Sequence, residues 1–200
     1  MRSSPLAVTV LSLLAYEPLH PYRMQRLMQE WGKDRVVNVG QRANLYKTIK
    51  RLLDAGLVAV RQTERDQQYP ERTVYELTDA GHDQVLVWLT EMLAVPRNEF
   101  PEFPAAMSFL MMLGPDQALE VLRTRTDAVR REVAGLEKQL GADDDFLPRV
   151  TRLETEYMRA VTAAELAWLE SVVADLEAGT LSWSADELAA VLDDEPSGDR

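Results

Sequence analysis

Residues 41–60 read QRANLYKTIKRLLDAGLVAV, and the expected architecture of the N-terminal part follows from this stretch. Apolar residues recur through its first part at helical spacing and predict a helix over about 41–55. They are Leu45, Ile49, Leu52 and Leu53. Gly56 ends this helix, and the β-rich run 57–60 follows at once. The stretch therefore predicts a helix that leads directly into a strand.

The return strand of a β-hairpin is predicted at 72–77, which reads RTVYEL. This run and 57–60 alternate in period 2, as half-buried strands do, and the polar stretch 61–71 lies between them. Thr78 is a good N-cap for a further helix, and Asp79 suits the first turn of that helix. We therefore expect a hairpin that is followed by a helix.

Two more helices are expected ahead of this stretch. The first, over 5–16, ends at Glu17-Pro18, because the residue before a proline resists the α region. The second begins at Pro21 and stops at Gly32. The order helix, helix, helix, hairpin, helix is that of a winged helix. An arbitrary small α+β domain is the alternative.

Three prolines punctuate residues 96–104 and predict a linker there. We expect a winged helix-turn-helix DNA-binding domain over 1–95, a helical domain over 105–192 and a disordered tail over 193–200. The predicted fold is mainly α with a small β-hairpin wing. Its C-terminal part is a helical, coiled-coil-like dimerisation domain.

The helical domain contains a heptad seam, in which successive positions are 3 and 4 residues apart. The seam consists of Leu119, Leu122, Thr126, Val129, Val133, Leu136 and Leu140, and all but Thr126 are predicted dimerisation residues. A second long helix is expected over about 147–177. The seam has three interpretations: packing within the chain, a homodimer interface, or contact with another protein. We favour the homodimer, because a lone two-helix unit leaves apolar faces uncovered and a two-fold dimer presents two recognition helices.

Charge is distributed unevenly along the chain, whose formal net charge is −11. Residues 1–80 hold 12 Lys and Arg against 9 Asp and Glu, a net charge of +3. Residues 81–200 hold 10 against 24, a net charge of −14. An asymmetry of this kind indicates that the first part meets a polyanion and the second does not.

The helix over 41–55 has a polar face whose side chains suit double-stranded DNA. An α-helix fits the major groove, where arginine pairs with guanine, asparagine with adenine, and lysine or a tyrosine hydroxyl with phosphates. The predicted DNA-binding residues of this face are Arg42, Asn44, Tyr46, Lys47, Lys50 and Arg51, with Thr48 beside them. Such a face can also be merely solvated. Its position as the third helix, directly ahead of a hairpin, favours DNA.

The hairpin tip offers further contacts. Arg65 and Arg72 bracket it and are predicted to reach the DNA backbone or the minor groove. The acidic residues Glu64, Asp66 and Glu71 stand among them and oppose such a contact.

Several classes of protein are disfavoured by what the sequence contains. The chain has no cysteine, and its two histidines have neither a metal-ligand nor a catalytic context. No phosphate-binding loop and no constellation of nucleophile, base and orienting group can be named. The apolar run 6–15 is too short to span a bilayer and has no signal-peptide cleavage site. We therefore expect a cytoplasmic protein that is not an enzyme, with no cofactor, no metal and no membrane partner.

Aromatic residues suggest a candidate effector pocket between the domains, led by Trp88 and Trp168. Aromatic residues at helical spacing more often belong to a hydrophobic core. Both interpretations stand on sequence alone.

Four stretches resemble the PadR family of bacterial transcriptional regulators. They are PLAVTVLSLL at 5–14, PLHPY at 18–22, NLY at 44–46 leading to LLDAGL at 52–57, and TVYELTDAG at 73–81. This chain departs from the family pattern at Pro21, where a glycine is usual, and at Asn44, where a small residue is usual. The resemblance covers most of the chain.

This resemblance implies a homodimeric repressor whose long C-terminal helices build the dimer. It also implies release from DNA by a small, often aromatic or drug-like ligand. The predicted partners are thus double-stranded DNA, a second copy of the chain and a small effector. The alternative function is a protein-interaction module, in which the acidic helical domain docks a protein partner.

Overall fold

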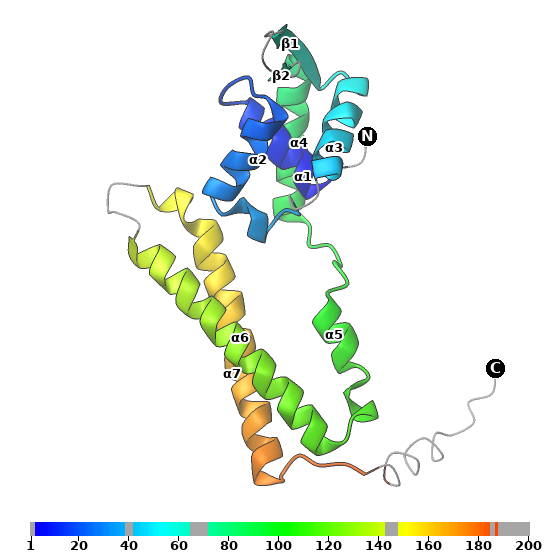
Figure 1. Ribbon diagram of the computed structural model, residues 1–200, viewed down its shortest axis with the longest axis vertical. Coiled ribbons are helices and arrows are strands. Elements are labelled where there is room, and N and C mark those ends of the chain that lie inside the picture. Colours follow the sequence, from blue (N-terminus) through cyan, green and yellow to red (C-terminus); the bar gives the residue numbers. More distant parts are fainter. Residues whose placement is uncertain (1–2, 39–41, 65–71, 143–147, 185–186, 188–200) are drawn as a thin grey trace, which may run out of the picture. The chain divides into compact units, whose positions relative to one another are not determined.

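A computed structural model describes residues 3–38, 42–64, 72–142, 148–184 and 187 (Figure 1). The chain divides into two compact units, residues 1–98 and 99–200. The division falls within the stretch predicted as a linker, 96–104. No helix formed by the described residues has the length and apolar character needed to cross a membrane.

The first unit has the element order of a winged helix, as predicted. Its elements are α1 (Pro5–Leu14), α2 (Pro21–Glu30), a short 3-10 helix (Lys33–Arg35), α3 (Arg42–Asp54), β1 (Val58–Glu64), β2 (Arg72–Leu77) and α4 (Asp79–Ala94). Local sequence sets several of these boundaries. The Ser4 hydroxyl accepts a hydrogen bond from the Ala7 amide at the start of α1, and the Thr78 hydroxyl accepts one from the Gly81 amide at the start of α4.

The core of the first unit is built around α1, which is apolar on nearly every side. Six of its ten residues are buried, and it contacts both α3 and α4 (Figure 1). From α3 the core receives Leu45, Ile49 and Leu52, which are the residues of the predicted apolar stripe. An all-round apolar helix is expected at the centre of a unit rather than at its surface. Because this face of α3 is buried in the core, the opposite face of the helix points to solvent.

The hairpin is joined to the helices at its base. β1 and β2 pair antiparallel, with Val58 opposite Leu77 and an irregularity in register between Val60 and Gln62. Leu19, in the turn between α1 and α2, exchanges two backbone hydrogen bonds with Tyr75 of β2, of 2.9 and 3.0 Å. The hairpin is thereby anchored beside the turn that joins the first two helices.

The start of α4 lies very close to the start of β1. A Cβ atom added at Gly81 would stand 2.0 Å from the Leu57 carbonyl oxygen. Close approach of two backbones without an intervening side chain is a common reason for glycine inside a helix. Gly81 therefore allows α4 to dock on the hairpin.

The second unit consists of helices. They are α5 (Glu102–Met107), a 3-10 helix (Leu110–Met112), α6 (Pro115–Ala142), a 3-10 helix (Arg149–Thr151) and α7 (Leu153–Ala178). Two of these bounds differ from the prediction. Helix α5 begins inside the expected linker, and α7 begins at Leu153 rather than near 147. The expected short helix near 184–192 and tail over 193–200 lie almost wholly outside the described residues.

Most of the heptad seam of α6 packs within the chain, which is one of the three interpretations that the sequence left open. Helices α6 and α7 lie side by side (Figure 1). Leu122 and Val129 of the seam share a core with Leu169 and Leu176 of α7. Four of the six predicted dimerisation residues are buried in the single chain: Leu122, Val129, Val133 and Leu136. Because the chain already covers them, they offer little surface to a second copy; Leu119 and Leu140 are only partly buried.

Polar groups along α6 are satisfied within the helical pair. The Thr126 hydroxyl, the polar interruption of the seam, donates to the Leu122 carbonyl of its own helix at 2.8 Å. Arg123 and Arg130 of α6 form ion pairs with Glu177 and Glu170 of α7 at 2.6 and 2.9 Å. Each of these exposed ion pairs contributes about 1 kcal/mol or less to the stability of the fold. Their main effect is to favour one register of α6 against α7.

Candidate nucleic-acid interface

Helix α3 presents the cationic face that the sequence predicted. Arg42, Lys47, Lys50 and Arg51 are exposed, and the Tyr46 ring is 51% exposed. With Asp54 as its one carboxylate, α3 carries a formal charge of +3. Among the residues that the structure describes, Lys47, Lys50 and Arg51 form no ion pair. Their charges are therefore available to an anionic partner.

Helix α2 differs from α3 in this respect. Its arginines Arg23 and Arg26 both pair with Glu30, at 3.6 and 2.8 Å. A cation that is already paired attracts a polyanion less strongly. The uncompensated positive charge of the described helix-turn-helix is thus concentrated on α3.

Two polar residues of α3 are less exposed to solvent than predicted. Thr48 is buried, with 7% of its surface exposed, and it faces α1 rather than solvent. Asn44 is half-buried. Both residues lie on the side of α3 that approaches the first turn of α1, one helical turn apart. The prediction of an exposed Thr48 is wrong, because the 3.6-residue period places it next to the buried Leu45 and Ile49.

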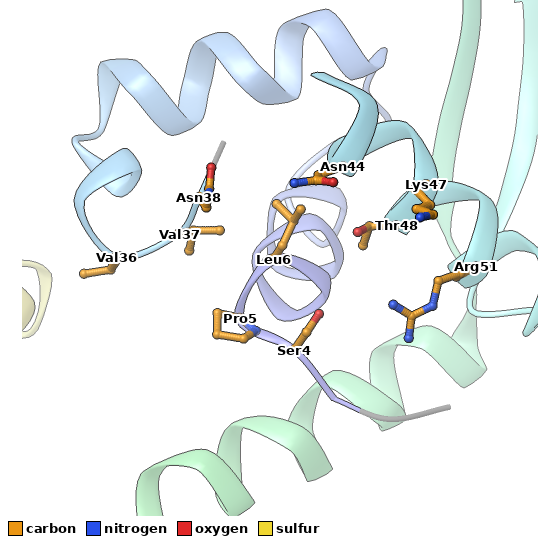
Figure 2. A pocket seen from close by; sticks show the side chains of 10 residues that line it. All are labelled: Ser4, Pro5, Leu6, Val36, Val37, Asn38, Asn44, Lys47, Thr48 and Arg51. Carbon is orange, nitrogen blue, oxygen red and sulfur yellow. The ribbon is translucent and has the colours of Figure 1, made fainter. Parts of the chain in front are cut away.

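A hollow of about 350 Å³ lies beside this flank of α3 (Figure 2). The first turn of α1 and the segment 36–38 form its other walls. Its lining residues are Ser4, Pro5, Leu6, Val36, Val37, Asn38, Asn44, Lys47, Thr48 and Arg51. Three of these, Asn44, Lys47 and Arg51, were predicted from sequence. Thr48 was placed beside them, whereas residues 4–6 and 36–38 were not predicted, because nothing in a one-dimensional pattern brings these two segments to α3.

The hairpin supplies less than the sequence suggested. Arg61 stands 4.0 Å from Glu76 on the neighbouring strand, so part of its charge is compensated. Arg72 begins β2 opposite Glu64. Arg65 lies outside the described residues. Helix α3 contacts the hairpin through β1. On β2, the pKa of Tyr75 is raised by burial and, to a smaller extent, by the electrostatic influence of Tyr46.

The two tryptophans predicted to lead an effector pocket lie in different units. Trp88 is 4% exposed and belongs to the core of the first unit, which is the alternative that the sequence left open. Trp168 of α7 is 45% exposed. Its ring makes an edge-to-face contact with Phe103 at 6.2 Å between centroids. The Arg125 guanidinium covers the Phe103 ring at 3.5 Å.

Helix α7 carries an exposed apolar surface that is separate from the heptad seam of α6. We call it the α7 stripe; it consists of Leu153, Tyr157, Val161 and Trp168, each between 45 and 67% exposed. Spacings of 4, 4 and 7 residues place all four on one side of the helix. The side toward α6 is different, since it carries Thr162, Leu169 and Leu176. The stripe is an apolar face that the described chain leaves uncovered.

Comparison with known proteins confirms the resemblance and the fold. Residues 10–86 match the sequence profile of the Transcriptional regulator PadR-like family. The Negative transcriptional regulator PadR of Bacillus subtilis (strain 168) is 22% identical over 167 residues, which cover 78% of this chain and 86% of that protein. The chain is therefore similar in sequence to a PadR protein over 78% of its length.

Solved structures of PadR proteins have a fold similar to that of this chain. The crystal structure of Bacillus subtilis PadR in complex with operator DNA has a TM-score of 0.68 at 20% identity, covering 88% of this chain and 99% of that one. The crystal structure of the same protein in complex with p-coumaric acid has a TM-score of 0.67 at 20% identity, covering 86% and 98%. At this level of identity the likeness shows the fold, a winged helix followed by helices.

Proposed function

We propose that this PadR-like chain is a sequence-specific transcriptional repressor that acts in the cytoplasm and binds a two-fold operator as a homodimer. The observation that carries the proposal is the exposed cationic face of α3, whose Lys47, Lys50 and Arg51 pair with no described carboxylate, in the third-helix position of a winged helix. The PadR of Bacillus subtilis, whose fold is similar, was crystallised with operator DNA. That structure supports DNA binding by this chain as well. A blocked promoter is the expected consequence.

In this proposal α3 enters the major groove. Lys47, Lys50 and Arg51 contact phosphates, while Arg42 and the Tyr46 hydroxyl reach base edges or the backbone near them. Asn44, being half-buried, contributes less to base reading than its residue type suggests. Arg65 and Arg72 of the hairpin are proposed to follow the flanking backbone. Phosphate contacts make the affinity strongly dependent on salt.

The α7 stripe is the proposed homodimer surface, in place of the heptad seam. Covering four large apolar side chains removes a substantial exposed patch, and a symmetric pairing of one surface with itself satisfies both copies. The dimer positions two α3 helices for the two halves of an operator.

A small-molecule effector is proposed to release the repressor. The structure of Bacillus subtilis PadR with p-coumaric acid supports an aromatic compound. Trp168 remains a candidate contact for it, because the residue is 45% exposed, whereas the core residue Trp88 is 4% exposed. The effector acts if it binds the DNA-free form of the dimer more tightly than the DNA-bound form.

The test of DNA binding is fluorescence anisotropy with a labelled fragment from upstream of the protein's own gene, across a salt series and with random DNA as competitor. The double change Lys47→Ala and Lys50→Ala is expected to weaken binding about tenfold or more and to flatten the salt dependence. Lys138→Ala, an exposed lysine on α6, is the matched control. Unchanged affinity of the double variant in low salt would refute the assignment of α3.

A second candidate function is a protein-interaction module, which the net charge of −14 over residues 81–200 favours. It predicts a stoichiometric protein partner and no measurable affinity for DNA. If selection from a random DNA pool returned no sequence, and a pulldown recovered such a partner, this function would take first place.

A further inference from the structure

The hollow beside α3 has two chemically different walls. One wall is apolar and consists of Pro5, Leu6, Val36 and Val37. The other wall is the flank of α3, where Asn44, Lys47, Thr48 and Arg51 lie. Figure 2 shows Asn44 over Leu6 and Arg51 directed from α3 toward the first turn of α1. The hollow is open to solvent, and its volume of about 350 Å³ lies near the lower end of the range of small-molecule sites.

The charge of the hollow is uncompensated. Lys47 and Arg51 are four residues apart and therefore share one side of α3. Within the part of the chain that the structure describes, the lining includes no carboxylate and neither cation has an ion pair. The two positive charges thus stand beside an apolar wall.

We propose that this hollow binds a small amphipathic carboxylate, with its carboxylate on Lys47 and Arg51 and its apolar body against Leu6, Val36 and Val37. Carboxylates form strong, often two-pronged hydrogen bonds with arginine. A DNA phosphate alone would use the cations and leave the apolar wall without a role. The two walls together select a ligand that is apolar at one end and anionic at the other.

Such a ligand would regulate DNA binding by direct competition. The proposed function assigns Lys47 and Arg51 to operator phosphates, and the inference rests on that function for its regulatory part. A carboxylate held by both cations neutralises them and occupies the space beside α3. No change in dimer geometry is needed, which separates this route from an effector at Trp168.

The binding site is tested first on the full-length protein without DNA. The probe is 2-naphthoate, whose own fluorescence reports binding, and its neutral isostere 2-naphthamide is the comparison. We expect 2-naphthoate to bind, and 2-naphthamide to bind about tenfold more weakly or worse, because the charge-assisted hydrogen bonds are lost.

Variants on each wall locate the bound probe. Lys47→Gln and Arg51→Gln should each weaken 2-naphthoate about tenfold, and Val36→Ser should weaken it by a few fold through lost apolar contact. The matched controls are Lys138→Gln and Leu93→Ser, whose side chains are exposed and lie outside the hollow. All the altered positions are exposed, and unchanged circular dichroism melting verifies that each variant folds.

Two results would overturn the inference. One is no binding of 2-naphthoate by the wild-type protein; if Lys47→Gln then still weakens operator binding, the hollow serves DNA phosphates alone. The other is binding that responds to Trp168→Ala but to none of the hollow variants, since the probe would then lie at α7.

Operator competition separates failure of the site from failure of the proposed function. In the anisotropy assay, 2-naphthoate should raise the apparent Kd of the protein for the operator. Once the concentration of 2-naphthoate exceeds the Kd for 2-naphthoate, the apparent operator Kd should rise in proportion to that concentration. If 2-naphthoate binds in the hollow but the protein binds no operator, the function is wrong and the site stands. If operator binding is intact and insensitive to saturating 2-naphthoate, the competition is refuted.

Discussion

Replacing Gly81 by alanine tests how the DNA-binding unit is held together. Alanine usually stabilises a helix relative to glycine by about 1 kcal/mol. At Gly81, however, the new Cβ would stand 2.0 Å from the Leu57 carbonyl oxygen and 2.8 Å from a methyl group of Leu77. A carbonyl oxygen cannot rotate away as a side chain does. Helix α4 must therefore move off the hairpin.

The magnitude follows from these opposing terms. Overpacking that requires a backbone shift costs about 1–3 kcal/mol or more, and a 2.0 Å contact with backbone belongs at the upper end. After subtraction of the helix gain, a net loss of about 2 kcal/mol is expected. For a unit of about 100 residues, this loss lowers the Tm by roughly 10 °C.

The assay is thermal and urea unfolding of the full-length variant, followed by circular dichroism. Gly135→Ala is the matched control, because Gly135 lies inside α6 and a Cβ there meets nothing within 4 Å. It should stabilise the second unit by up to about 1 kcal/mol. If Gly81→Ala proved as stable as Gly135→Ala, the close packing of α4 on the hairpin would be refuted.

Three further variants probe the second unit. Leu169→Ala removes a fully buried side chain of α7 and should lower the free energy of unfolding by about 2–5 kcal/mol; a loss below 1 kcal/mol in urea titrations would contradict the α6–α7 core. Tyr157→Asp in the α7 stripe should give monomers in sedimentation, whereas Glu132→Asp, on the exposed surface of α6, should not; a dimeric Tyr157→Asp protein would place the interface elsewhere. Hydrogen bonding from Arg149, with smaller help from the charges of Arg149 and Arg152, holds the pKa of Glu156 below its usual value. A depressed carboxyl pKa stabilises the fold above the unfolded-state pKa, about 4.3, and the stabilisation disappears as the pH falls through the folded-state pKa. The wild type should therefore exceed Glu156→Gln in stability at pH 7 and match it near pH 2, and a difference independent of pH would exclude this linkage.

Local patterns were enough to predict the elements of the first unit. The stripe of Leu45, Ile49 and Leu52 identified α3 and its outward cationic face, because the period of a helix decides which residues share a side. Thr78 capped α4 as expected from its residue type and position. These features depend on neighbours within a few residues, which the sequence displays directly.

Local patterns were less informative where prolines occur. The three prolines at 96–104 suggested a linker, yet α5 begins at Glu102. Proline is compatible with the first turn of a helix, whose amides have no acceptor in any case. Packing then decides, since Phe103 and Met107 lie against the core of the second unit.

Residue patterns along the chain predicted the helices, the hairpin and the faces that these elements must bury. Hydrophobic periodicity shows which face of an element is apolar, but it does not show which element packs against that face. Tertiary structure therefore decided that the seam of α6 is covered by α7, that Trp88 is core, and that the α7 stripe is left exposed. It alone brought residues 4–6 and 36–38 to the flank of α3, because contacts between segments distant in sequence leave no periodic pattern in either segment.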